Sequence, residues 1–137
     1  MPEDAPVELT ELAPEESWER LRTAAVGRVA MVRGGLPSVV PVNICVAESA
    51  VWFRVGPGGL LDAALAGHVL SVEADEVDRF THSGWSVVVT GRAEVAAERL
   101  DLPIGSWGRP DADHLVRVGA DLVTGRSLGP RLVDSGH

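Results

Sequence analysis

Apolar residues alternate with polar or small residues in several short segments of this chain, and turn-forming residues separate the segments. Alternation with a period of two is typical of β-strands that bury one face. The segments are rich in valine and other residues that strands favour. The pattern predicts strands over residues 28–32, 38–46, 50–55, 69–77 and 85–95, followed by one bent strand or two strands over residues 114–118 and 121–128.

Two other segments have features of helices. After Pro14, apolar residues recur at i, i+3 and i+7 until Gly27, which predicts a helix that starts at a proline and ends at a glycine. Residues 60–66 form a shorter apolar segment closed by Gly67, which predicts a second helix. Many short strands, few helices and frequent turns predict a mainly β protein with short helices, in the form of a small closed β-barrel.

The strand pattern continues without a linker or an internal repeat, which predicts one domain. We expect an N-terminal arm over residues 1–13, a barrel domain over residues 14–128 and a C-terminal tail over residues 129–137. Pro41 cannot donate a backbone hydrogen bond, so its strand is expected to be an edge strand or to have a bulge there. Residues 96–102 are expected to form a short helical turn.

Composition and charge narrow the classes of function. The chain has 137 residues, of which 45% are hydrophobic, and its net charge is −8. All 12 positive residues are arginines scattered along the chain, so we expect no nucleic-acid partner. No apolar run reaches the ~18 residues of a membrane span, and the acidic N-terminus lacks the apolar region of a signal peptide. A single cysteine, Cys45, excludes an internal disulfide, and together these features predict a cytoplasmic protein.

The clearest candidate for a binding site is Arg54, followed by a glycine-rich turn at residues 56–59. Backbone N–H groups gather in a turn that opens a helix, and anions can bind there. A guanidinium beside the turn adds a permanent positive charge that suits phosphate. The turn has neither the Gly-Lys-Ser of a P-loop nor a GxGxxG pattern, so an ordinary turn beside a strand-end arginine remains the alternative.

The other candidates are isolated residues. Asn43 lies within an apolar strand, where its amide either faces solvent or binds a ligand. Trp85 and Trp107 either pack within the protein or form walls for a flat ring system. The four histidines lack metal-ligand spacing, so no metal site is predicted. No nucleophile and no acid–base pair identifies a catalytic residue, which stays unassigned.

Six segments, taken in order, resemble the pyridoxamine 5′-phosphate oxidase-like family in its actinobacterial form, the small FMN-binding split barrels. The segments are GRVA at residues 27–30, PVN at 41–43, FRVGPG at 53–58, VEADEVD at 72–78, GWSVVV at 84–89 and VTGR at 123–126. The resemblance implies a split β-barrel that forms a homodimer. It also implies that FMN lies in the cleft between the two subunits.

The resemblance further implies which residues bind the cofactor. Residues 41–43 are expected beside the isoalloxazine ring, and the cofactor-binding residues between 53 and 61 are expected to lead to the phosphate. Residues 85 and 86 are expected to approach the ring from the partner subunit. The expected cofactor-binding residues are Pro41, Val42, Asn43, Phe53, Arg54, Val55, Gly59, Leu60, Leu61, Trp85, Ser86 and Trp107.

One departure from the family concerns the phosphate. Relatives usually carry a lysine after the glycines, at the position where this chain has Leu60. A charged contact to phosphate contributes about 1.5–3 kcal/mol, so its loss is expected to weaken FMN binding about tenfold to a hundredfold.

The resemblance implies an FMN-binding protein that acts on a small molecule as a flavin-dependent oxidoreductase, by hydride or electron transfer without a protein proton donor. Four alternatives remain open. They are a non-catalytic flavin-binding protein, a haem-binding protein, a deazaflavin-dependent reductase, and a barrel with no redox cofactor that performs other chemistry.

Overall fold

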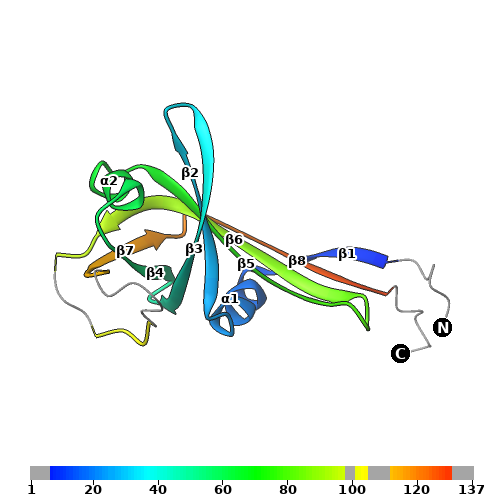
Figure 1. Cartoon of the computed structure of the whole chain (residues 1–137). Helices are drawn as coiled ribbons and strands as arrows, with labels where there is room; N and C mark the ends of the chain where they lie inside the picture. Colours follow the sequence, from blue (N-terminus) through cyan, green and yellow to red (C-terminus); the bar gives the residue numbers. More distant parts are fainter. Residues whose placement is uncertain (1–6, 98–100, 105–111, 131–137) are drawn as a thin grey trace.

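A computed structural model of the chain describes residues 7–97, 101–104 and 112–130. Within these residues the protein is mainly β, with eight strands and two short helices (Figure 1). The helices are α1 (Pro14–Arg22) and α2 (Gly59–Leu65). The strands are β1 (Val7–Leu12), β2 (Val26–Arg33), β3 (Leu36–Ala47), β4 (Ala50–Val55), β5 (Val69–Asp78), β6 (Ser83–Val95), β7 (His114–Gly119) and β8 (Leu122–Pro130).

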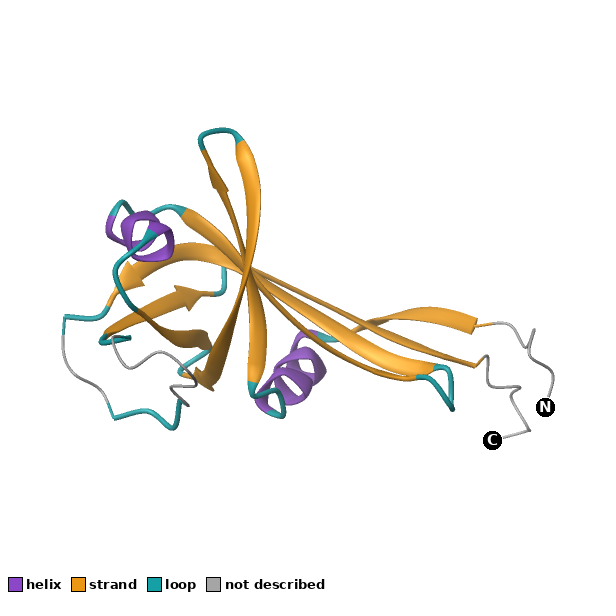
Figure 2. Ribbon diagram, viewed as in Figure 1, coloured by secondary structure: helices purple, strands orange, loops and turns teal. Residues whose placement is uncertain are grey.

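Six of the strands close into a barrel. Their order around the barrel is β6, β5, β2, β3, β4 and β7, and β7 closes it by pairing with the last residues of β6. The first part of β6 pairs instead with β8, which in turn pairs with β1. The strands β5, β6, β8 and β1 therefore continue away from the barrel as an extended sheet (Figure 2).

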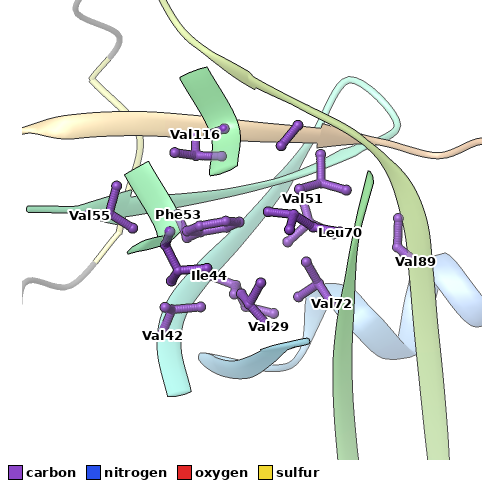
Figure 3. Packing of buried hydrophobic residues seen from close by; sticks show 14 of the residues in the cluster. Val29, Val42, Ile44, Val51, Phe53, Val55, Leu70, Val72, Val89 and Val116 are labelled. Atoms are coloured by element: carbon purple, nitrogen blue, oxygen red, sulfur yellow. The ribbon is translucent and has the colours of Figure 1, made fainter. Parts of the chain in front are cut away.

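Aliphatic side chains fill the barrel interior around Phe53. Alternate residues of each strand point inward, so the core contains side chains from all six strands and from α2. Phe53 has no exposed surface, and Figure 3 shows it among Val42, Ile44 and Val55. The period of two in the sequence is thus the signature of this single interior.

Strand β4 is buried on both faces, which explains its continuous apolar run. Its other face packs in a second, smaller cluster where Trp52 lies with Ala50 and Leu115. The indole Nε1–H of Trp52 donates a hydrogen bond to the carbonyl of Ala47 at 2.9 Å. The guanidinium of Arg117 lies 5.9 Å from the centroid of the indole ring, within the range of a cation–π contact.

Helix α1 packs against the sheet through its small and apolar residues. It begins at Pro14, and Ser17 and Leu21 are its buried residues. A Cβ on Gly125 of β8 would overlap Ser17 Oγ, so a glycine at this position lets the helix and the strand approach closely. No helix in the part of the chain that the structure describes is long and apolar enough to cross a membrane.

The sheet extends beyond both bounds expected for the barrel domain, residues 14 and 128. Residues Val7–Leu12 form β1 and pair with β8 along their whole length. Residues 129 and 130 of the expected tail belong to β8 and pair in the same ladder. The local pattern could not show this pairing because the two strands lie near opposite ends of the chain.

The structure bears on three other local expectations, which concern Pro41, residues 96–102 and residues 114–130. The β2–β3 register runs without interruption through Pro41, so there is no bulge. Strand β3 pairs with β4 only from Ile44 onward, so Pro41 has a neighbouring strand on one side only, as the edge alternative required. Residues 96, 97, 101 and 102 are not helical, and residues 98–100 of the expected helical turn lie outside the described residues. Residues 114–130 contain two strands. The other predicted strands and both helices are confirmed, with ends that differ by a few residues.

Candidate functional site

A row of residues from three neighbouring strands lies on the outer face of the barrel. Arg28 of β2 is directly opposite Pro41 of β3 on one side and Glu73 of β5 on the other. Directly paired residues of antiparallel strands have their side chains on the same face. The next residues, Val29 and Val72, belong to the core, so this row faces outward. Pro41, which the resemblance places beside the isoalloxazine ring, therefore lies in one row with the ionisable residues Arg28 and Glu73.

Arg28 bridges two carboxylates on this face. Its Nη1 donates to Glu73 Oε1 at 3.2 Å and to Asp75 Oδ2 at 3.1 Å. The two acidic side chains are 32% and 34% exposed, so water reaches them only in part. Burial raises the pKa of Glu73 to about 7, as do a hydrogen bond to Asp75 and its charge, although Arg28 acts in the opposite direction. Glu73 therefore titrates near neutral pH.

Replacement of Glu73 by glutamine is expected to reduce the dependence of stability on pH. The pKa of Glu73 is about 7 in the folded chain and has an ordinary value of 4.5, so folding takes up a proton between these pH values. The stability that this proton contributes is complete below about pH 4.5 and is lost as the pH rises through about 7. Glutamine cannot ionise, so the melting temperature of Glu73→Gln should fall less between about pH 5 and about pH 8.

Circular dichroism melts across this pH range measure the effect. Glu76→Gln is the matched control, because Glu76 is an exposed carboxylate on the same strand that makes no ion pair with a described residue. Equal pH profiles for the parent and Glu73→Gln would contradict the proton uptake assigned to Glu73.

Five of the expected cofactor-binding residues point into the barrel. These residues all belong to the core cluster and have at most 8% of their surface exposed. They are Val42, Phe53, Val55, Leu60 and Leu61. Two of them, Val55 and Leu60, also line a cavity at the end of the barrel together with Gly59. Of the other three, Phe53 has no exposed surface.

The side chains of Asn43 and Arg54 point outward from the barrel, because both residues alternate with core residues of their strands. Asn43 is half-buried and lines a cavity of about 530 Å³ between β3 and the connection that follows α1. Arg54 is also half-buried and is directly opposite Leu115 of β7. The cavity at the glycine turn is lined by Val55 rather than by Arg54. The arginine and the turn, adjacent in sequence, thus present their groups on different sides of β4.

Trp85 and Ser86 point to opposite faces of β6, as successive residues of a strand must. Trp85 is half-buried and packs against the core, whereas Ser86 is directly opposite Asp75 on the outer face. Trp107 lies outside the described residues, so its expected role stays a prediction. The structure therefore gathers Pro41 and Ser86 around the carboxylate pair and places Trp85 elsewhere.

The sequence alone did not reveal the cluster of Arg28, Glu73 and Asp75, which contains a group able to exchange a proton near neutral pH. The available signal was the spacing of two carboxylates at i and i+2 on a strand, which puts both on one face. Their cation comes from another strand, and only the β2–β5 register identifies it. Within the described residues, no group of three or more His, Cys, Asp or Glu could hold a metal ion.

Comparison with known proteins places this barrel in a family. Residues 13–127 match the family model described as pyridoxamine 5′-phosphate oxidase. The chain is 32% identical over 128 residues to the uncharacterized protein Rv0080 of Mycobacterium tuberculosis, with 86% of this chain and 84% of that protein covered.

Two solved structures are similar along nearly their whole length. The FAD binding protein of Mycobacterium smegmatis is 30% identical with a TM-score of 0.70, covering 88% of this chain and 98% of that one. An FAD-binding protein of Mesorhizobium loti is 27% identical with a TM-score of 0.73, covering 90% and 99%. The resemblance seen in the six ordered segments is confirmed: the chain belongs to the pyridoxamine 5′-phosphate oxidase family.

Proposed function

We propose that this protein binds a flavin nucleotide, FMN in the first instance, and acts on a small molecule as a flavin-dependent oxidoreductase. The observation that carries the proposal is a cleft where β2 and β5 separate. The two strands pair only over residues 28–30 and 71–73. Beyond these pairs a cavity of about 430 Å³ opens, lined by Ala30, Met31, Val32, Pro37, His68, Val69, Leu70 and Ser71.

The cleft suits a flat ligand with a large apolar surface. Its volume lies within the range of about 300–1,000 Å³ that is typical of small-molecule sites. Val32 and Val69, two of its wall residues, are 65% and 58% exposed. A ring that covers them removes apolar surface from water, which contributes about 25 cal/mol for each Å² buried.

The relatives support a flavin as this ligand. Two similar structures are those of FAD-binding proteins from Mycobacterium smegmatis and Mesorhizobium loti. A bound flavin supplies hydride and electron transfer. Ala30 and Ser71 of the cleft lie two positions from Arg28 and Glu73 on the same outer face. Glu73 can therefore hold or release a proton near neutral pH beside the ligand.

The proposal includes a homodimer. The paired residues Val77, Gly84, Leu128 and Leu9 form an apolar row across four strands on the outer face. Val77, Leu128 and Leu9 are 65%, 37% and 60% exposed in the single chain. Contiguous exposed apolar surface of this kind marks an interaction site, and a second copy of the chain covers it by a self-complementary contact.

Flavin uptake tests the ligand and the dimer together. The purified protein is incubated with FMN or FAD and desalted, and its visible spectrum and its mass by light scattering are measured. We expect a flavin spectrum that survives desalting and the mass of a dimer. A protein that retains neither flavin would overturn the ligand, and a flavin-loaded monomer at micromolar concentration would overturn the dimer.

Turnover distinguishes an enzyme from a flavin carrier. The flavin-loaded protein is reduced and then mixed with a panel of small-molecule acceptors, and its reoxidation is followed by absorbance. Catalytic reoxidation by at least one acceptor supports an oxidoreductase. A flavin that stays bound but is never turned over identifies a non-catalytic binding protein.

The family resemblance assigns the phosphate to Arg54, whose side chain leaves β4 on the face opposite to Val55, a residue of the cavity at the glycine turn. If this assignment holds, replacement of Arg54 by alanine weakens FMN binding about tenfold to a hundredfold and leaves riboflavin binding unchanged. A charged hydrogen bond contributes about 1.5–3 kcal/mol, and riboflavin has no phosphate to receive it. Titrations followed by flavin fluorescence give both affinities. Arg20→Ala on the exposed side of α1 is the control, and equal FMN affinity of Arg54→Ala and the parent would exclude Arg54 as a phosphate ligand.

A further inference from the structure

The cavity beside the glycine turn opens at the end of the barrel. Its volume is about 360 Å³. It is lined by Met31, Arg33, Val40, Val55 and residues 56–60. The β2–β3 hairpin projects beyond the barrel (Figure 1), and Arg33 is the last residue of β2 before the hairpin turn. The cavity thus lies between this hairpin and the turn that precedes α2.

The guanidinium of Arg33 lies against the backbone of the turn. A Cβ on Gly59 would be 2.6 Å from Arg33 Nη1, closer than real Cβ atoms approach a neighbour. A Cβ on Gly58 would meet nothing within 4 Å, so the backbone there faces open space. The φ of Gly58 is +151°, a conformation that side-chain-bearing residues rarely adopt. The turn is therefore a bare stretch of backbone with a cation beside it.

Arg33 is the only charged residue in the described lining of this cavity. The ion pairs among the described residues involve Arg28 and not Arg33. Asp62, the acidic residue in the first turn of α2, is exposed and is not part of the lining. Helix α2 has only seven residues, so its dipole adds little. Arg33 therefore supplies the only formal charge in the described lining of the cavity.

We infer that Arg33 binds the phosphoryl group of the flavin nucleotide in this cavity. This role depends on the flavin binding proposed above and names the end of the ligand that the cavity holds. A guanidinium presents parallel N–H donors that match a phosphate and never loses its charge. Glycines allow the phosphate to approach the backbone. Met31, Val40 and Val55 contact the adjoining carbon chain.

Arg33 and Arg54 can be tested separately because they belong to different strands, β2 and β4. Arg33 lines the cavity itself, whereas Arg54 leaves β4 on the face opposite to the cavity residue Val55. The monophosphate of FMN and the diphosphate of FAD share the chemistry that Arg33 recognises. The two nucleotides are therefore separate arms of the experiment.

The experiment compares the parent protein with Arg33→Ala, Arg33→Lys and the surface control Arg79→Ala. Each protein is titrated with FMN, FAD, riboflavin and inorganic pyrophosphate by calorimetry, and its melting temperature is measured to establish that it is folded. We expect Arg33→Ala to bind FMN, FAD or both about tenfold to a hundredfold more weakly. Riboflavin affinity should not change, and Arg33→Lys should recover part of the loss.

The outcomes separate the role of Arg33 from flavin binding itself. Unchanged affinity of Arg33→Ala for both nucleotides would overturn the inference, as would an equal loss for riboflavin. If Arg33→Ala loses affinity for FMN alone, Arg33 binds the terminal monophosphate. If it loses affinity for both FMN and FAD, Arg33 binds the phosphoryl group that the two nucleotides share. If the parent protein binds no flavin, the proposed function fails. In that case, pyrophosphate binding by the parent that Arg33→Ala loses would still support an anion site at Arg33. A parent that binds no pyrophosphate either would overturn the anion site.

Discussion

Phe53→Ala is expected to lower the free energy of unfolding by about 3–5 kcal/mol, the range found when a buried aromatic residue is removed. Phe53 is fully buried at the centre of the barrel (Figure 3), and its strand is covered on both faces. The closed ring of strands limits how far the walls can move inward to fill the space. The loss therefore includes both the transfer of the ring to water and a residual cavity.

Urea unfolding followed by tryptophan fluorescence measures this loss. The chain has only one other phenylalanine, Phe80, which is 95% exposed in the β5–β6 turn and serves as the matched control. Phe80→Ala should change stability by no more than about 0.5 kcal/mol. A similar, small effect of both substitutions would contradict the placement of Phe53 at the centre of the core.

Gly91→Ala is expected to destabilise the protein by about 3 kcal/mol or more, the upper end of overpacking effects. Gly91 lies where β6 changes its neighbour from β8 to β7. A Cβ here would overlap the carbonyl oxygen of Gly119 at the end of β7. Backbone atoms cannot turn aside as a flexible side chain can, so the strands must separate at the position where the barrel closes.

Thermal and urea unfolding of Gly91→Ala measure the effect. Gly129→Ala is the control, because a Cβ on Gly129 would meet nothing within 4 Å. The control should unfold like the parent, and Gly91→Ala should unfold earlier or fail to fold. Parental stability of Gly91→Ala would contradict the close approach of β6 and β7.

Most elements of the fold could be predicted from local patterns. Pro14 marks the start of α1, and the glycine pair Gly34 and Gly35 marks the β2–β3 turn, where both residues have positive φ. A glycine inside a strand indicates a bend, and Gly91 lies where β6 changes its neighbour from β8 to β7. The pairing of β1 with β8 escaped prediction because its sequence signal is weak and its partner is remote.

The candidate site could be predicted only in part. In the structure, the alternation along β3 and β4 places Val42 and Phe53 inward and Asn43 and Arg54 outward, although the resemblance had assigned Phe53 and Arg54 together. The same rule separates Trp85 from Ser86, which the resemblance had assigned together. Cofactor contacts remain predictions, because each depends on atoms outside a single chain.

The sequence by itself determined the strand-rich class, the main turns, the two helices and the family of this protein. The strands and helices depend on residues that are close together in the chain, because a spacing of two positions in a strand, or of three to four in a helix, puts side chains on one face. The family is visible in six such segments taken in order. Only the tertiary structure decided that Arg28 joins Glu73 and Asp75, and that Arg33 lies against Gly59. Those contacts depend on strand register and on a hairpin reaching a distant turn, and neither is encoded in local periodicity.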